Sequence, residues 1–183
     1  MDKNRTSGLQ PLEVEHILLS KLMNEHGPEL KRIAFLYIND ITESEDIVQE
    51  VFISCYQHLA SFRNEADYKT WLIRITINKC KDHRRLWGIR NLVYRPIHQL
   101  VKKNESAEAT HLDQQFSSEL IEQISKLSSK YKEVLILYYY LELTMQEISE
   151  VLEISINTVK SRLLRGKKSL KTRLGRSEQH GQV

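Results

Sequence analysis

The chain has 183 residues, with 27 Lys and Arg against 24 Asp and Glu, so its formal net charge is only +3. This length allows one or two domains. Only 6 Gly and 3 Pro, with few alternating β-branched runs, favour an all-α fold. No stretch approaches roughly 18 consecutive apolar residues and the start lacks an apolar run, so neither a transmembrane helix nor a signal peptide is expected. Two cysteines, Cys55 and Cys80, do not make a disulfide framework, which favours a reduced, cytoplasmic setting.

Charge is divided into alternating blocks along the chain. Residues 1–69 carry a net charge of −5, residues 70–103 carry +8, residues 104–158 carry −7 and residues 159–183 carry +7. Two separated basic segments that both coincide with expected helices predict two contacts with one polyanion. The acidic blocks indicate that something other than DNA binds the opposite faces.

Two helical segments are expected before residue 60. After a loose tail over 1–12, apolar residues recur at helical spacing over 14–38, and Gly27 and Pro28 interrupt them, which predicts two helices that meet there. Thr42 with Glu45 is typical of a capping box that opens the next helix, which runs to about Leu59. Its buried stripe leaves an acidic, amide-bearing outer side with Asp46, Gln49 and Glu50.

A polar loop with aromatic side chains, over 60–69, precedes a helix predicted over 68–87, which Asp67 can cap. The inner face of this helix carries Leu72 and Ile75, and its exterior is basic. Because rings stack on unpaired bases and a basic helix follows a phosphate backbone, the segment is typical of a single-strand surface. Taken alone, Trp71 belongs to the inner face with Leu72 and Ile75 and is better explained by core packing. The candidates for this nucleic-acid surface are Phe62, Arg63, Tyr68, Trp71, Arg74, Asn78, Lys79, Lys81, Arg84 and Arg85.

Helical periodicity then fades over 88–113, which predicts a flexible linker between a first domain (14–87) and a second (114–175). In the second domain a stripe begins near Phe116, Ser128 and Ser129 interrupt it, and a very apolar helix over 132–141 is expected at the buried centre.

The stretch 144–173 predicts a helix-turn-helix. Thr144 and Glu147 form a capping box, a break falls over 153–155, and Ser155 can cap a second helix whose inner face holds Val159 and Leu163. An α-helix fits the major groove, where polar side chains near its start reach base edges and basic ones neutralise phosphate. The candidates are Asn157, Thr158, Lys160, Ser161, Arg162, Leu164 and Arg165.

Three motifs in this order, DIVQEVF (46–52), FRNEADYKTWLIRITINKCKDHRR (62–85) and TMQEISEVLEISINTVKSRLLRGKKSL (144–170), resemble bacterial RNA polymerase sigma factors of the extracytoplasmic-function subfamily. The resemblance covers about residues 25–174 and implies two helical domains joined by a linker. It implies that Asp46, Gln49 and Glu50 bind the clamp helices of the polymerase largest subunit. The second domain would contact the flap region.

The resemblance also implies DNA contacts. Asn78 would read a base of the promoter −10 element, with Arg74, Lys79 and Lys81 on its backbone, and the loop before this helix would hold an extruded base. Lys160, Ser161, Leu164 and Arg165 would face the groove of the −35 element, with Thr158 and Arg162 on the backbone. An anti-sigma factor, often membrane-anchored in this family, is a further expected partner.

Two positions depart from the family pattern. Glu153 stands where the family usually has Gly in the turn, and a positive φ there would carry strain of order 1 kcal/mol. Gly166 lies inside the second helix, where Gly costs about 1 kcal/mol relative to Ala, so the far end of that helix is expected to fray without DNA.

Two other function classes compete with this hypothesis. A stand-alone helix-turn-helix regulator would need a sensor pocket or a dimerisation helix in the first domain. A zinc site could form if the C-x-x-H pairs Cys55/His58 and Cys80/His83 faced each other, although Cys55 belongs to a buried stripe. No nucleophile–base spacing or phosphate-binding Gly loop stands out, so neither catalysis nor a cofactor is expected.

Overall fold

The computed structural model describes residues 11–62, 67–93 and 117–180. All regular structure in these three segments is helical, which confirms the all-α fold with two small helical domains. Among the helices described, none combines the length and the apolarity that a membrane span needs.

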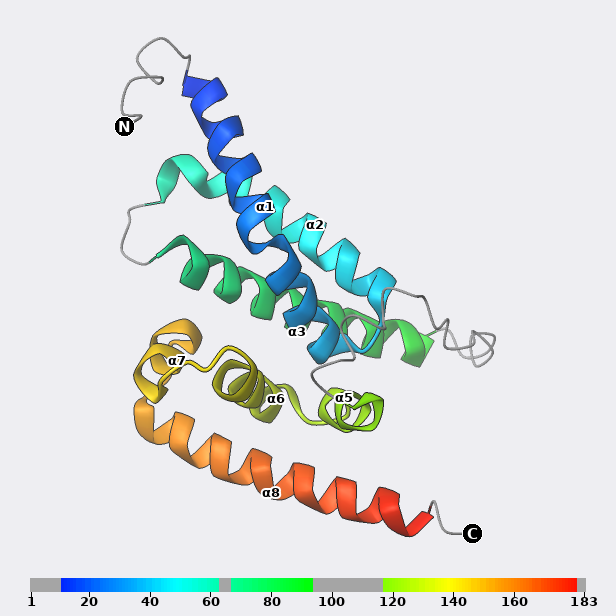
Figure 1. The fold of residues 1–183 in the computed structure, drawn as a ribbon. Coiled ribbons are helices and arrows are strands. Elements are labelled where there is room, and N and C mark those ends of the chain that lie inside the picture. Colours follow the sequence, from blue (N-terminus) through cyan, green and yellow to red (C-terminus); the bar gives the residue numbers. More distant parts are fainter. Residues whose placement is uncertain (1–10, 63–66, 94–116, 181–183) are drawn as a thin grey trace.

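Three long helices form the first domain: α1 (Pro11–Ile38), α2 (Ile41–His58) and α3 (Tyr68–Val93), with the short 3-10 turn η1 (Leu59–Ser61) after α2. They pack side by side (Figure 1). Their shared core includes Ile33, Val51, Leu72 and Ile77, each at most 1% exposed. The helices form because apolar residues at i, i+3 and i+4 place one continuous stripe on each of them.

Gly27 and Pro28 do not divide α1, so the prediction of two separate helices is wrong. Pro28 lacks the amide that would donate to the Asn24 carbonyl. Because Asn24 and Pro28 both face solvent, water can satisfy that carbonyl. Buried Leu22 on one side of the break and Leu30 on the other keep both halves packed on the same core.

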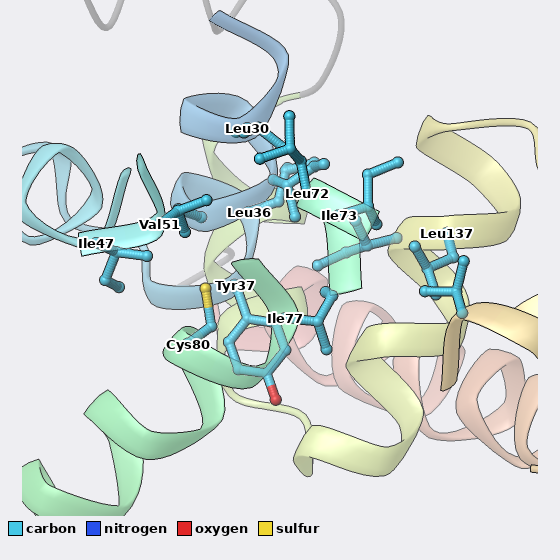
Figure 2. Packing of buried hydrophobic residues seen from close by; sticks show 14 of the residues in the cluster. Leu30, Leu36, Tyr37, Ile47, Val51, Leu72, Ile73, Ile77, Cys80 and Leu137 are labelled. Carbon is cyan, nitrogen blue, oxygen red and sulfur yellow. The ribbon is translucent and has the colours of Figure 1, made fainter. Parts of the chain in front are cut away.

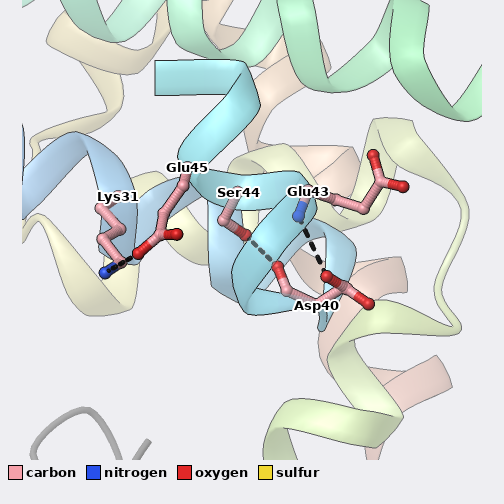
Figure 3. A network of polar contacts seen from close by, with 5 residues as sticks. All are labelled: Lys31, Asp40, Glu43, Ser44 and Glu45. Carbon is pink, nitrogen blue, oxygen red and sulfur yellow. Dashed lines mark hydrogen bonds and ion pairs between the residues drawn. The ribbon is translucent and has the colours of Figure 1, made fainter. Parts of the chain in front are cut away.

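Asp40, not Thr42, caps α2. The Asp40 carboxylate accepts from the Glu43 amide at 3.0 Å, and the Ser44 hydroxyl donates to the Asp40 carbonyl (Figure 3). Lys31 of α1 pairs with Glu45 in the first turn of α2, so the same turn is tied to its neighbour. The expected capping box over 42–45 therefore lies two residues too late.

Helix α3 extends six residues past its expected end, because it runs to Val93 rather than to residue 87. Residues 88–93, which were expected to begin the linker, belong to this helix. The loss of apolar periodicity there does not end the helix, because no Pro stands in 88–93 and every residue therefore has the backbone amide that continues the helical hydrogen bonds. The rest of the expected linker lies outside the described residues, as do the tail over 1–10, Arg63 and Phe116.

The second domain contains α5 (Ser118–Ser125), α6 (Ser129–Leu135), the π-helical turn η2 (Ile136–Tyr140), α7 (Met145–Leu152) and α8 (Ile156–His180). The Ser117 hydroxyl caps α5 by accepting from the Leu120 amide. The apolar helix expected over 132–141 is in fact α6 running into η2. A π turn is a local widening of the helix that apolar spacing does not reveal.

The two domains lie against each other. Helices α5, α6 and α7 form a layer between the three helices of the first domain and α8 (Figure 1). One apolar cluster runs through both domains, from Ile73 and Ile77 of α3 to Leu137 of η2 (Figure 2). This contact places the basic helix α3 beside the second domain.

Candidate nucleic-acid and protein interfaces

The helix-turn-helix forms as the sequence predicts. The Thr144 hydroxyl accepts from the Glu147 amide at 3.2 Å, and the Glu147 carboxylate accepts from the Thr144 amide at 2.7 Å, which completes the capping box. The Thr144 hydroxyl also donates to the Glu147 carboxylate at 2.7 Å, and this hydrogen bond, followed by the one from the Thr144 amide, holds the pKa of the Glu147 carboxyl below its ordinary value. Helix α7 ends at Glu153 in the left-handed conformation, with φ 54° and ψ 44°. The backbone of this turn is therefore not rearranged to a negative φ, and Glu153 adopts the strained left-handed conformation.

Helix α8 begins with a polar, open first turn. The Ser155 hydroxyl accepts from the Thr158 amide at 3.2 Å, as predicted for its cap. Val159 and Leu163 are 0% and 7% exposed, so they are the inner face. The opposite faces carry the exposed candidates Asn157, Lys160, Ser161, Leu164 and Arg165. The start of α8 thus presents hydrogen-bonding, apolar and cationic groups on one accessible surface.

Two of the α8 candidates already have side-chain partners within the protein. The Thr158 hydroxyl shares a hydrogen bond of 2.8 Å with Ser155. The Arg162 guanidinium donates to Glu133 of α6 at 2.9 Å, and the Glu133 side chain is only 3% exposed. Arg162 therefore already holds an anionic partner inside the protein.

Three aromatic rings gather where α3 begins. The centroid of Phe62 lies 4.6 Å from that of Tyr68 and 4.7 Å from that of Trp71, with interplanar angles of 27° and 31°. All three are partly exposed, so Trp71 belongs both to the edge of the core and to the surface. Such a stack offers flat apolar faces on which bases can stack.

The basic candidates of α3 divide into two groups. Asn78 is exposed, Lys79 pairs with Glu50 of α2 at 3.2 Å, and Arg85 pairs with Asp82 at 3.3 Å. The second group faces the second domain and consists of Arg74, Lys81 and Arg84. The structure therefore leaves only part of the predicted surface open to DNA.

The acidic face of α2 is exposed as predicted at Asp46, Gln49 and Glu50. One residue missed in the sequence extends it: Ile53, at 57% exposed, lies three and four positions after Glu50 and Gln49. An exposed branched side chain beside carboxylates can bury apolar area against a protein partner.

Lys132 and Glu133 were also missed, because both lie in a stretch that reads as apolar. Lys132 is 0% exposed, and its Nζ donates to the carbonyls of Tyr37 and Ser125, each at 2.6 Å. Its Nζ also lies 4.6 Å from the centroid of the Tyr37 ring. Burial and, to a lesser extent, the charge of nearby Arg84 together lower the pKa of Lys132 to about 7. A charged pair at the head of an apolar run was the signal available in the sequence.

The two C-x-x-H pairs are not brought together as a metal site. Cys55 and Cys80 are buried in the core, where desolvation raises their pKa values to about 11 and about 12. His58 Nδ1 donates to the Ser54 carbonyl, and His83 pairs with Glu43. No group of three or more His, Cys, Asp or Glu side chains suited to a metal occurs in the part of the chain that the structure describes.

Comparison with known proteins places both segments in one family. Residues 22–86 match the family model Sigma-70 region 2, and residues 117–170 match Sigma-70, region 4. The ECF RNA polymerase sigma factor SigW of Bacillus subtilis is 31% identical over 164 residues, which cover 84% of this chain and 87% of SigW. The RNA polymerase sigma factor SigV of the same organism is 28% identical and covers 88% of this chain and 93% of SigV.

Solved structures share the fold. CnrH, in complex with the cytosolic domain of CnrY, has a TM-score of 0.65 at 22% identity and covers 87% of this chain and 89% of CnrH. The sigma factor RpoE of Bartonella quintana, in complex with the anti-sigma factor NepR, has a TM-score of 0.65 at 20% identity and covers 91% of this chain and 98% of RpoE. Together with the family models and the identity to SigW, these matches show that the chain belongs to the extracytoplasmic-function (ECF) RNA polymerase sigma factors.

Proposed function

We propose that three surfaces of this sigma factor divide its work in promoter-specific transcription initiation. The outer face of α2 binds core RNA polymerase, the start of α3 takes the −10 element, and the start of α8 reads the −35 element. The observation that carries the proposal is the exposed polar start of α8, held by the Ser155 cap behind a left-handed turn. We also propose that residues 14–87 and 114–175 are the two functional domains.

In the −35 contact, α8 enters the major groove by its first three turns. Lys160, Ser161 and Arg165 reach base edges, and Leu164, at 72% exposed, offers an apolar contact to a thymine methyl. Asn157 and Thr158 lie at the helix start, where side chains and amides contact phosphate. Arg162 reaches the backbone only after it leaves Glu133.

In the −10 contact, the rings of Phe62, Tyr68 and Trp71 receive unpaired bases, each stacked base contributing about 1–3 kcal/mol. The exposed Asn78 amide reads a base edge. Arg63, outside the described residues, is proposed as a further contact with the same DNA. The cations that follow the backbone are Arg74, Lys79, Lys81, Arg84 and Arg85.

Polymerase contacts come from both domains. Asp46, Gln49 and Glu50, extended by Ile53, bind the clamp helices of the largest subunit. An open apolar groove of about 550 Å³ between η2, α5 and α8, lined by Leu120, Leu135 and Leu170, takes the flap region. Lys167 and Lys171 line the same groove and complement an acidic, amphipathic helix.

An anti-sigma factor is the proposed regulator, since RpoE and NepR form such a complex. It would cover surfaces that polymerase and DNA also need. The factor acts in the cytoplasm and is not an enzyme: it supplies specificity, while core polymerase performs nucleotide transfer.

The test is gel filtration of the purified chain with bacterial core RNA polymerase, followed by transcription from genomic fragments. Co-elution and new, mapped start sites are expected. Failure to co-elute, with tight sequence-specific binding to duplex DNA alone, would instead identify a stand-alone regulator.

Single substitutions then test how the surfaces divide. Lys160→Ala or Arg165→Ala is expected to lower activity at promoters that depend on the upstream element while co-elution with core is retained. Asp46→Ala or Glu50→Ala is expected to weaken co-elution instead. If the two pairs of variants behaved alike, the assignment of α2 and α8 to different partners would be wrong.

A further inference from the structure

Glu133 of α6 lies between the two helices that carry the proposed DNA contacts. Its Oε2 is 2.7 Å from Lys81 Nζ of α3, and its Oε1 is 2.9 Å from Arg162 Nη1 of α8. The contact with Lys81 is a close ion pair, while Arg162 donates a hydrogen bond. The Glu133 side chain is only 3% exposed, so its carboxylate is paired with these two cations instead of being hydrated.

Two further cations of α3 are held by the second domain. Arg74 donates to Glu153 at 2.7 Å and to the Glu150 carbonyl at 2.8 Å. Arg84 donates to the Ser125 carbonyl at the end of α5. Three of the cations assigned to the −10 backbone therefore have anionic or carbonyl partners in the second domain, where phosphate would otherwise bind.

The same interface is also packed and buried. Lys132, the residue before Glu133, donates to the carbonyl of Tyr37 at the end of α1, and the apolar cluster continues from α3 into η2 (Figure 2). A contact of this kind is a defined closed arrangement rather than a loose encounter of two surfaces.

We infer that Glu133 is an intramolecular competitor of DNA, a carboxylate that keeps the two domains closed by occupying Lys81 and Arg162 in place of phosphate. The inference rests on the proposed function, since that function assigns both cations to DNA. Closure and DNA binding then exclude each other, because a single cation cannot pair with the buried carboxylate and with an outside phosphate. Core polymerase, by binding α2 and the second domain separately, would favour the open form.

The size of the expected effect on DNA binding follows from the fraction of molecules in the open form. A factor with about one molecule in ten open binds DNA about tenfold more weakly than its open form does. Loss of the Glu133 carboxylate is therefore expected to strengthen DNA binding by up to about tenfold.

Glu133→Gln keeps the size of the side chain and removes its charge. The matched control is Glu122→Gln, which removes the same charge from an exposed ion pair with Lys126 inside α5. Spin labels on cysteines introduced at the exposed positions Gln57 of α2 and Lys168 of α8 report the distance between the domains. In the full chain, Glu133→Gln is expected to lengthen this distance and Glu122→Gln to leave it unchanged.

Fluorescence anisotropy with a mixed-sequence single-stranded oligodeoxynucleotide gives the second measurement. Glu133→Gln is expected to bind it more tightly than the wild-type chain and Glu122→Gln. An unchanged distance in folded Glu133→Gln would overturn the inference, while normal transcription with core polymerase would leave the proposed function standing. Opening without tighter DNA binding would also overturn it, since Glu133 would then hold the domains without competing with DNA.

Because Glu133 is buried, circular dichroism first establishes that the variant keeps wild-type helicity. Should Glu133→Gln unfold, Glu153→Gln provides the measurement, because the Glu153 side chain is 72% exposed and the substitution removes the charged one of the two partners of Arg74 without disturbing the core. Glu153→Gln is expected to shift distance and affinity in the same direction by a smaller factor. No shift in either quantity in this variant, with Glu133→Gln unfolded, would overturn the inference.

Discussion

Gly166 of α8 lies directly against Leu135 of α6. A Cβ atom at position 166 would be 3.3 Å from both Cγ and Cδ1 of Leu135 and 3.4 Å from Tyr131 Cβ. The missing side chain therefore lets α8 approach α6 closely. The sequence suggested that Gly166 weakens the far end of the helix, whereas the structure gives it a packing role.

Alanine substitution at two glycines of α8 tests this role. A Cβ at Gly175 meets nothing within 4 Å, so Gly175→Ala is expected to raise the free energy of unfolding by up to about 1 kcal/mol through helix propensity. Gly166→Ala gains the same propensity but crowds Leu135, and we expect no net gain. Urea unfolding measures both, and an equal gain in the two variants would show that the contact with Leu135 is unimportant.

Glu153 carries its left-handed conformation at a cost. A non-glycine residue there costs about 1–2 kcal/mol. Glu153→Gly and Glu153→Ala both remove the ion pair with Arg74, but only glycine relieves the strain. We expect Glu153→Gly to be more stable than Glu153→Ala by about 1 kcal/mol in thermal or urea unfolding. Equal stability would mean that the turn rearranges in one of the variants.

The helix-turn-helix could be predicted from the sequence because its determinants are local. Thr144 with Glu147 and Ser155 with Thr158 are pairs three residues apart, and the inner residues Val159 and Leu163 are four apart. A local signal was misleading where tertiary packing opposed it. Pro28 indicated a break in α1, but packing on both sides of it keeps the helix continuous.

The contacts between the domains could not be predicted in this way. Arg74 and Glu153 are 79 residues apart in the sequence, and local spacing does not show which charges meet in the fold. In a run that is apolar on every face, helical periodicity does not show which positions face the core. It therefore did not show that Lys132 and Glu133 are buried. The sequence therefore identified the DNA-binding candidates but not which of them are engaged inside the protein.

Salt dependence should distinguish the roles of two neighbours on α8. Arg165→Ala removes one exposed cation that is proposed to reach a base edge, so we expect discrimination at that base pair to relax by about 1–3 kcal/mol and the slope of promoter affinity against salt concentration to fall. Leu164→Ala removes only apolar contact and is expected to change sequence preference while leaving that slope unchanged. Both are measured by holoenzyme binding to a mapped promoter across a salt series. A reduced slope in Leu164→Ala would show that the helix has shifted in the groove.

Lys132 predicts that stability rises with pH just above neutrality. Its pKa is about 7 in the folded chain, because burial disfavours the charged form, against an ordinary value of 10.5. Between these values the unfolded chain binds more protons than the folded chain, so the free energy of unfolding increases with pH. The slope for one such group is at most about 1.4 kcal/mol per pH unit. Urea unfolding from pH 7 to about 8.5 measures it.

Lys132→Met is the matched variant, because it keeps the length of the side chain and removes its titration. We expect the wild-type slope to exceed that of Lys132→Met in this window. Above about pH 8.5 the two buried cysteines act in the opposite direction, since their raised pKa values keep them protonated when folded while the unfolded thiols ionise. They are present in both chains and cancel in the difference. Equal slopes would mean that Lys132 keeps its ordinary pKa, and that the closed interface accommodates a full positive charge beside Arg84.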